Sequence, residues 1–426
     1  MTIEEIYSLF LQFPLVETDT RNLKTGSLFF ALKGGNFNGN LFAKQALEKG
    51  AAYAIIDEAD CSIEGKTILV EDVLTCLQQL AAHHRTQLNI PVIGITGSNG
   101  KTTSKELLHT VLSTTYRTST TIGNLNNHIG IPLTLLRIPL DAEMAVIEMG
   151  ANHQKEIASY CTYAGPSHGI ITNCGKAHLE GFGGVEGVRK GKGELYDHLR
   201  SINGTAFVMW DYDYLRNMSS SIGELIKYGT ADADVEGTIR TAQPFLEVEM
   251  TKGSLLGPIR TQLVGDYNLP NVLMAVAVGQ YFNVAAENIR TAIENYTPSN
   301  SRSQLVKSGS NQIILDAYNA NPSSLRSAIE NLIRLEAKNK VLMLGAMAEL
   351  GEESIHEHQQ IIDLIDQSEW KDVVLVGGDF LHISHRYKSF ADSTAARDWY
   401  QKQSFEDCHI LIKGSRSQKM EQILQP

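Results

Sequence analysis

Short runs of apolar residues alternate with helical patterns along most of the chain. Such runs occupy residues 54–56, 92–95, 145–147 and 169–171, and each is bounded by glycine or polar residues. Buried strands that alternate with helices are typical of parallel sheets covered on both faces. The pattern therefore predicts an α/β fold. The other strand candidates are residues 68–70, 206–208, 312–315, 341–344, 373–376 and 410–412.

The strand candidates fall into three series, and each series predicts one domain. A helical pattern that includes Val73 and Leu80 ends the first series, and the polar residues 86–89 follow it as a candidate hinge. A length of 426 residues also fits about three domains of ordinary size. We expect three α/β domains with mostly parallel sheets, over residues 1–86, 87–300 and 301–426.

Composition and charge narrow the class of protein. The chain carries 37 basic and 48 acidic residues, a net charge of −11, which argues against a nucleic-acid partner. Five widely spaced cysteines without a CxxC pair argue against a disulfide framework and a zinc site. The N-terminus lacks the basic start of a signal peptide, and no stretch approaches the roughly 20 apolar residues of a membrane span. We expect a cytoplasmic protein without membrane insertion.

A glycine-rich segment, residues 94–103, follows a strand candidate and opens a helix. Glycines let backbone N–H groups turn toward phosphate oxygens, and the helix N-terminus adds a partial positive charge. Lys101 is spaced to reach the β- and γ-phosphates, and the Thr102 hydroxyl is a ligand for Mg²⁺. The usual GxxxxGK[ST] spacing would place glycine where Ile95 stands, so the loop is a variant, and a glycine-rich turn without a ligand is the alternative. The candidate ATP-binding residues are Gly97, Ser98, Asn99, Gly100, Lys101, Thr102 and Thr103.

Two residues after neighbouring strands are candidate metal ligands. Glu148 ends the apolar run 145–147, where an acid is costly unless it meets a cation. His178 follows the strand candidate 169–171 and lies in range of the same crevice, although a histidine there is often structural. The alternative for Glu148 is an exposed acid at a strand end. His356 and His358 are two residues apart on a predicted helix and point different ways, so they do not form a metal pair.

These segments resemble the central ATPase domain of the Mur ligases, cytoplasmic enzymes that build the peptide stem of bacterial peptidoglycan. The resemblance rests on residues 96–103, Glu148, 171–173 and 177–179, and it extends over nearly the whole chain. It implies an N-terminal UDP-binding domain, a central P-loop ATPase domain and a C-terminal Rossmann-like domain. In the first of these, residues 19–21 and 26–34 are similar to the family's UDP-binding segments.

Three further segments are most similar to one branch of the family. They are residues 123–134, 316–322 and 413–416. The branch joins D-Ala-D-Ala to UDP-N-acetylmuramoyl-tripeptide through an acyl phosphate and releases ADP and phosphate. Asn38 and Asn40 replace an aspartate and a histidine common in the family, and Ala346 replaces an aspartate.

The resemblance also implies the roles of single residues. Lys101, Glu148, His178 and Lys192 would be catalytic, with Lys192 carbamylated by CO₂. Two Mg²⁺ ions, replaceable by Mn²⁺, would be held by Thr102, Glu148, His178 and the Lys192 carbamate; taken alone, Lys192 reads as a solvated lysine. ATP would also contact Asn268, Asn271, Arg302 and Asp316, of which the two asparagines also suit helix capping. The implied substrate contacts are Thr20, Arg21, Lys33, Gly34, Asn124, Asn126, Asn127, Asn319, Asn321, Lys413, Ser415 and Arg416.

Several alternatives stay open from the sequence. The same chemistry serves the family members that add the third residue of the stem and those that extend folate with glutamate. A nucleotide switch is a candidate of another class, but no guanine-reading Asn-Lys-x-Asp segment occurs. A catalytically weakened paralogue would fit Ala346. We expect a monomeric enzyme that acts on small molecules.

Overall fold

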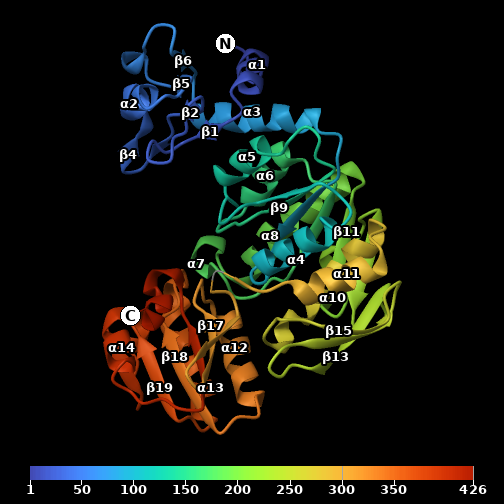
Figure 1. Ribbon diagram of the computed structural model, residues 1–426, viewed down its shortest axis with the longest axis vertical. Helices are drawn as coiled ribbons and strands as arrows, with labels where there is room; N and C mark the ends of the chain where they lie inside the picture. Colours follow the sequence, from blue (N-terminus) through green and yellow to red (C-terminus); the bar gives the residue numbers. More distant parts are fainter. Residues whose placement is uncertain (300, 426) are drawn as a thin grey trace.

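The computed structural model describes residues 1–299 and 301–425 and contains three large sheets. Figure 1 shows the first sheet (blue) at one end of the molecule and the third (orange to red) at another, with the middle sheet between them. The fold is α/β with mostly parallel strands, as the hydrophobic pattern predicts. Within the described residues, no helix combines the length and the apolar character needed to cross a membrane.

The first sheet has four parallel strands in the order β1-β2-β5-β6. Helix α3 leaves this sheet and packs against α5 and α6 of the middle region, so it joins the two domains. The elements are α1 (Ile3–Gln12), β1 (Val16–Glu17), β2 (Leu28–Phe30), the hairpin β3 (Lys33–Gly34) and β4 (Phe37–Asn38), α2 (Ala43–Glu48), β5 (Tyr53–Ile56), β6 (Thr67–Leu69) and α3 (Val73–Gln87).

The middle sheet has nine strands in the order β15-β14-β13-β12-β11-β10-β7-β9-β8. The seven strands from β7 to β13 pair in parallel. Strands β14 and β15 extend the sheet from β13 with antiparallel pairing. The strands are β7 (Val92–Thr96), β8 (Thr118–Thr120), β9 (Met144–Glu148), β10 (His168–Ile171), β11 (Thr205–Met209), β12 (Glu224–Gly229), β13 (Val235–Thr241), β14 (Glu247–Lys252) and β15 (Gly257–Arg260). The helices are α4 (Lys101–Leu112), α5 (Gly130–Leu136), α6 (Glu156–Ala164), α7 (Leu179–Phe182), α8 (Val185–Ile202), α9 (Asp213–Met218), α10 (Leu269–Tyr281) and α11 (Ala286–Asn295).

The third sheet has the order β16-β17-β21-β18-β19-β20, and only β16 runs antiparallel to its neighbour among these described strands. Its strands are β16 (Gln304–Ser308), β17 (Asn311–Asp316), β18 (Asn339–Gly345), β19 (Asp372–Val376), β20 (Lys388–Phe390) and β21 (Cys408–Lys413). Its helices are α12 (Pro322–Arg334), α13 (Ser354–Asp366) and α14 (Ser393–Tyr400).

The predicted hinge at residues 86–89 begins inside a helix, because α3 continues to Gln87. Arg85 fixes the segment that follows, since its guanidinium donates to the carbonyl oxygens of Leu88 and Ala164. The domain limits of 1–86, 87–300 and 301–426 stay predictions. Residue 300 itself lies outside the described residues.

One histidine gives this fold a measurable pH dependence. His168 begins β10, lies among the rings of Phe207, Tyr281 and Phe282, and accepts or donates at Nδ1 to the Ser167 hydroxyl at 2.9 Å. Burial lowers its pKa from 6.5 to about 4. Between pH 6.5 and 4, His168 is therefore protonated in the unfolded chain but stays neutral in the folded chain. The free energy of unfolding is then highest above pH 6.5 and falls as the pH drops toward 4.

We expect His168→Gln to flatten this pH dependence. Each pH unit in the window costs up to about 1.4 kcal/mol for one proton, so wild type should lose about 3 kcal/mol more than the variant between pH 6.5 and 4. Urea unfolding at several pH values measures the two slopes. Equal slopes would show that His168 titrates normally in the folded protein.

Candidate active site

A polar cavity of about 900 Å³ lies between the middle and third domains. Its wall includes the loop before α4, the ends of β9 and β10, the start of α10 and the first turn of α12. Ligands of parallel α/β sheets bind at the carboxyl ends of the strands, and this cavity lies at those ends. The cavity is therefore the candidate active site.

The loop between β7 and α4 is held open by its neighbours. Gly97 has φ of 144°, and a Cβ there would lie 1.9 Å from the Thr172 hydroxyl oxygen, so only glycine fits. Ser98 donates its backbone N–H to the Asn173 carbonyl at 2.9 Å, and Asn99 donates to the Asn173 side chain at 3.0 Å. The end of β10 thus fixes the loop so that the N-terminus of α4 faces the cavity, which favours an anion there.

Lys101 folds back over this loop. Its Nζ donates to the carbonyl oxygens of Gly97 at 2.5 Å and Ser98 at 3.3 Å. Burial lowers the pKa of its ammonium, Glu148 raises it in part, and Arg302 lowers it further. The side chain lines the cavity, so it is poised to exchange carbonyl partners for phosphate oxygens.

Glu148 ends β9 as a buried acid that is 2% exposed. Its carboxylate accepts from the Thr102 hydroxyl at 3.0 Å and from the Asn126 amide at 2.8 Å. The structure thereby brings together two of the predicted metal ligands, Thr102 and Glu148. Both offer hard oxygen atoms, which fits Mg²⁺.

His178 lines the same cavity, but the acid beside it is Glu349 and not Glu148. Its Nδ1 lies 2.5 Å from the Glu349 carboxylate of the third domain. This contact lowers the pKa of the Glu349 carboxyl. Within the described part of the chain, no three His, Cys, Asp or Glu side chains gather closely enough to hold a metal ion. A second metal at His178 therefore needs a donor of another kind.

Lys192 is buried on α8 and is 1% exposed. Its ammonium donates to the Ala151 carbonyl at 2.9 Å and lies 4.8 Å from the centre of the Phe182 ring. Burial, reinforced by the charge of Lys101, lowers the pKa of Lys192 to about 7. Lys192 is thus not the solvated lysine that its sequence suggests when taken alone.

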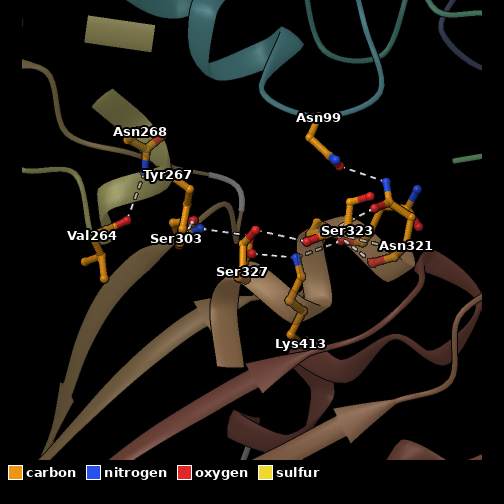
Figure 2. A network of polar contacts seen from close by, with 12 residues as sticks. Asn99, Val264, Tyr267, Asn268, Ser303, Asn321, Ser323, Ser327 and Lys413 are labelled. Carbon is orange, nitrogen blue, oxygen red and sulfur yellow. Dashed lines mark hydrogen bonds and ion pairs between the residues drawn. The ribbon is translucent and has the colours of Figure 1, made fainter. Parts of the chain in front are cut away.

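The predicted nucleotide contacts come from the start of α10 and from the third domain, and they share the cavity with the phosphate loop. Asn271 donates to Asn268 at 2.9 Å and accepts from the Ser104 hydroxyl. Asn268 in turn donates to the Val264 carbonyl at 2.9 Å (Figure 2). Arg302 stacks on the Tyr318 ring at 3.6 Å. Asp316 pairs with Lys413 at 2.5 Å and accepts from the Ser303 N–H. Asn268, Asn271, Arg302, Asp316 and Lys413 all line the cavity.

Contacts between the middle and third domains close one side of the cavity. Figure 2 shows Asn99 and Asn321 pointing toward each other, and the Asn321 amide donates to the Asn99 side chain at 2.7 Å. Lys176 donates its backbone N–H to the Ser323 hydroxyl, and its Nζ lies 2.5 Å from Glu357. The phosphate loop region is therefore bound directly to the first turn of α12.

Family profiles cover the three regions in the same order. The profile of the Mur ligase family, catalytic domain, matches residues 13–85, that of the Mur ligase middle domain matches 95–279, and that of the Mur ligase, glutamate ligase domain, matches 301–416. The chain belongs to the Mur ligase family. The resemblance drawn from the phosphate loop, Glu148 and the segment around His178 is thereby confirmed.

This Mur ligase is similar over its length to relatives of one branch. It is 35% identical to the UDP-N-acetylmuramoyl-tripeptide–D-alanyl-D-alanine ligase of Bacillus subtilis, with 96% of this chain and 92% of that one covered. Among solved structures, MurF from Acinetobacter baumannii superposes with a TM-score of 0.87 at 30% identity over 96% and 92% of the two chains. MurF from Thermotoga maritima in complex with ADP has a TM-score of 0.87 at 25% identity over 97% of each chain.

The residues implied as substrate contacts fall into two groups in this Mur ligase. Asn124, Asn126, Asn127, Asn319, Asn321, Lys413 and Arg416 line the cavity. Ser415 is buried behind the cavity wall, where its hydroxyl donates to the Ala346 carbonyl at 2.5 Å. Thr20, Arg21, Lys33 and Gly34 lie in the first domain, outside this cavity.

The two asparagines that depart from the family pattern have structural roles in the first domain. Asn40 is buried, donates to the Asp57 carboxylate at 2.7 Å and accepts from the Asp57 N–H at 3.0 Å. Asn38 donates to Glu58 and caps the turn that contains Asn40. Lys33 pairs with Asp57 at 3.0 Å, so both asparagines support the position of one predicted substrate contact.

Sequence reasoning missed Glu349, which reaches the cavity from the loop after β18. It also missed that Asn126 binds the Glu148 carboxylate, because the two residues lie 22 positions apart along the chain. Asn126 and Glu148 belong to the same predicted domain, and this was the one sequence signal for their contact. Glu349 lies three residues after Ala346, and because Ala346 departs from the family pattern, no catalytic role was predicted around it; only the docking of the third domain brings Glu349 to His178.

Proposed function

We propose that this Mur ligase joins D-Ala-D-Ala to UDP-N-acetylmuramoyl-tripeptide and consumes ATP. The products are UDP-N-acetylmuramoyl-pentapeptide, ADP and phosphate, in the synthesis of peptidoglycan precursors. The observation that carries the proposal is the 35% identity, over 96% of this chain, to a ligase named for that reaction. The cavity that holds Lys101, Thr102 and Glu148 supports it on chemical grounds.

The central difficulty of the reaction is to bring one anion to another. The terminal carboxylate of the tripeptide attacks the γ-phosphorus of ATP, the bond to ADP breaks, and an acyl phosphate forms. The D-Ala-D-Ala amine then attacks the acyl carbon, loses a proton, and phosphate leaves. Lys101 and Arg302 line the cavity as cations that lower the repulsion and stabilise the transferred charge.

Thr102 and Glu148 would hold a nucleotide-bound Mg²⁺, and His178 with carbamylated Lys192 would hold a second ion. The metal ions supply charge neutralisation at the phosphates when bound. A carbamate adds the anionic oxygen donor that the His178 side of the site needs, and its formation from CO₂ requires an uncharged amine. A pKa of about 7 makes the Lys192 amine partly uncharged at neutral pH. Mn²⁺ would replace Mg²⁺ well at an imidazole ligand.

Different residues of the cavity lining would bind the different substrates. Asn268, Asn271, Arg302 and Asp316 would bind the nucleotide, and Asn124, Asn126 and Asn127 would bind the muramoyl-peptide. Further contacts to the peptide or dipeptide would come from Asn319, Asn321, Lys413 and Arg416, with Ser415 supporting them from behind. Thr20, Arg21, Lys33 and Gly34 would bind the uridine diphosphate. We further propose that the enzyme acts as a monomer in the cytoplasm.

Phosphate release tests the proposal directly. Purified protein with ATP, Mg²⁺ and UDP-N-acetylmuramoyl-tripeptide should release phosphate rapidly only after D-Ala-D-Ala is added, and mass spectrometry should detect the pentapeptide. The matched control replaces the tripeptide by UDP-N-acetylmuramoyl-dipeptide and the dipeptide by single amino acids. Turnover in that control would favour the ligase for the third residue, and release that needs no acceptor would favour a nucleotide switch.

A further inference from the structure

The loop between β18 and α13 reaches from the third domain onto the segment that follows His178. Glu349 lies in this loop with φ of 62°, and its carbonyl accepts from the Glu180 N–H at 3.4 Å. Gly351 lies so close to the same residue that an added Cβ would be 3.3 Å from the Glu180 Cβ. The loop therefore packs on α7 and delivers the Glu349 side chain to His178.

The loop is anchored firmly to its own domain. Ala346 donates its N–H to the Val376 carbonyl at 2.9 Å and accepts from the buried Ser415 hydroxyl at 2.5 Å. Met347 donates its N–H to Nε2 of His358 at 3.0 Å, and the other ring nitrogen donates to the Ser354 carbonyl at 2.7 Å. Ser415 and His358 therefore hold the backbone of the loop in place, and the loop forms a rigid support for Glu349.

Glu349 approaches His178 closely, and it does so at Nδ1 of the ring. Nδ1 of His178 is buried and has no hydrogen-bond partner of ordinary geometry among the described residues, and the Glu349 carboxylate, 2.5 Å away, is the acceptor beside it. The His178 side chain as a whole remains 21% exposed. His178 lines the cavity, and Nδ1 is its one ring nitrogen found buried without a partner. The Glu349 side chain is 50% exposed and lines the cavity too, so it is not committed to the protein core.

We propose that Glu349 is a positioning residue that fixes the tautomer and orientation of His178, an inference that rests on the proposed ligase function. A carboxylate beside Nδ1 keeps the ring proton on that nitrogen and leaves the Nε2 lone pair free. Nε2 is then directed into the cavity as an electron-pair donor. Glu349 acts through His178 and needs no contact with the substrates.

His178 belongs to the middle domain and Glu349 to the third, so their contact depends on how the two domains dock. His178 adopts the donating form only when the third domain is docked on the middle domain. Docking also brings Arg302 and Asp316 to the cavity, so the cationic, nucleotide-binding and donor groups assemble in one step. ATP is thereby protected from reaction in an open enzyme, in which water has access to the acyl phosphate.

Two variants separate this role from a simple ion pair between domains. Glu349→Ala removes the acceptor and should lower kcat for D-Ala-D-Ala-dependent phosphate release about 10- to 100-fold, with the KM for ATP nearly unchanged. Glu349→Gln keeps an oxygen acceptor and should recover part of the loss. Glu352→Ala is the matched control, because Glu352 is an exposed acid three residues along the same loop.

The ring of His178 provides a readout that does not depend on activity. In full-length protein with ¹⁵N-labelled histidine and no added metal, NMR should show the Nδ1–H form at His178, assigned with His178→Gln. Glu349→Ala should shift the ring toward the Nε2–H form, and Glu352→Ala should not. An unchanged ring in Glu349→Ala, or a wild-type kcat, would overturn the inference. Absence of D-Ala-D-Ala-dependent turnover in wild type would instead defeat the proposed function, while the NMR result would still report the contact.

Discussion

Replacing Lys101 by alanine is expected to abolish ligase turnover while the fold stays intact. The ammonium lies against the turn of the phosphate loop, where the Gly97 and Ser98 carbonyls hold it. Loss of one preorganised donor that meets developing charge lowers kcat by on the order of 1,000-fold. Phosphate release at saturating ATP, tripeptide and D-Ala-D-Ala measures the effect.

The fold should tolerate this change, because it removes a charge that the protein partly buries. Lys101 carries a lowered pKa, so its removal relieves a desolvation cost rather than breaking a core contact. Thermal unfolding of Lys101→Ala should therefore match wild type within a few degrees. Lys44→Ala, which removes an exposed lysine on α2 of the first domain, serves as the control for charge. Normal turnover in Lys101→Ala would remove the assignment of the phosphate loop.

The features that the sequence predicted well are those that depend on neighbours along the chain. Strands such as β7 and β9 are wholly buried, so continuous apolar runs announce them. The phosphate loop is likewise local, since strand, glycines, lysine and helix follow one another within about twelve residues. Its departure at Ile95 is explained by position, because Ile95 is a buried residue of β7 and not part of the turn.

The antiparallel extension of the middle sheet was not predicted. Strands β13 and β14 are only half buried, and polar residues alternate with apolar ones along both. A half-buried strand of six or seven residues gives a weak pattern compared with a continuous apolar run. The short β1 of the first sheet was missed for a similar reason, because two residues show no period.

The assembly of the site was beyond the reach of sequence reasoning wherever it crosses domains. Asn321 meets Asn99 across 222 residues of chain, and Lys176 meets Glu357 across 181. Such contacts depend on how one folded domain docks on another, and no local pattern encodes that geometry. The same limit explains why His178 was predicted as a ligand while Glu349 beside it was not.

Replacing Lys192 by alanine is expected to give an inactive enzyme that short carboxylic acids partly restore. Lys192 is buried on α8, where its ammonium donates to the Ala151 carbonyl at 2.9 Å and lies 4.8 Å from the centre of the Phe182 ring. A permanently charged lysine is a poor occupant of that buried position, whereas a carbamate would bring an anionic oxygen donor beside Ala151, which lines the cavity. We expect a loss on the order of 100-fold in kcat, the scale found when a group that supports a metal site is removed.

Acetate or formate should diffuse into the space left by the side chain and supply the missing oxygen donors. Recovery should rise with carboxylate concentration and saturate, and chloride at equal ionic strength should give none. Lys190→Ala is the matched control, since Lys190 lies two residues earlier on the same helix with its side chain exposed. In wild type, ¹³C-labelled bicarbonate should produce a carbamate resonance that Lys192→Ala lacks. A fully active Lys192→Ala enzyme without added carboxylate would refute the carbamate, because its neutral side chain supplies neither a charge nor an oxygen donor.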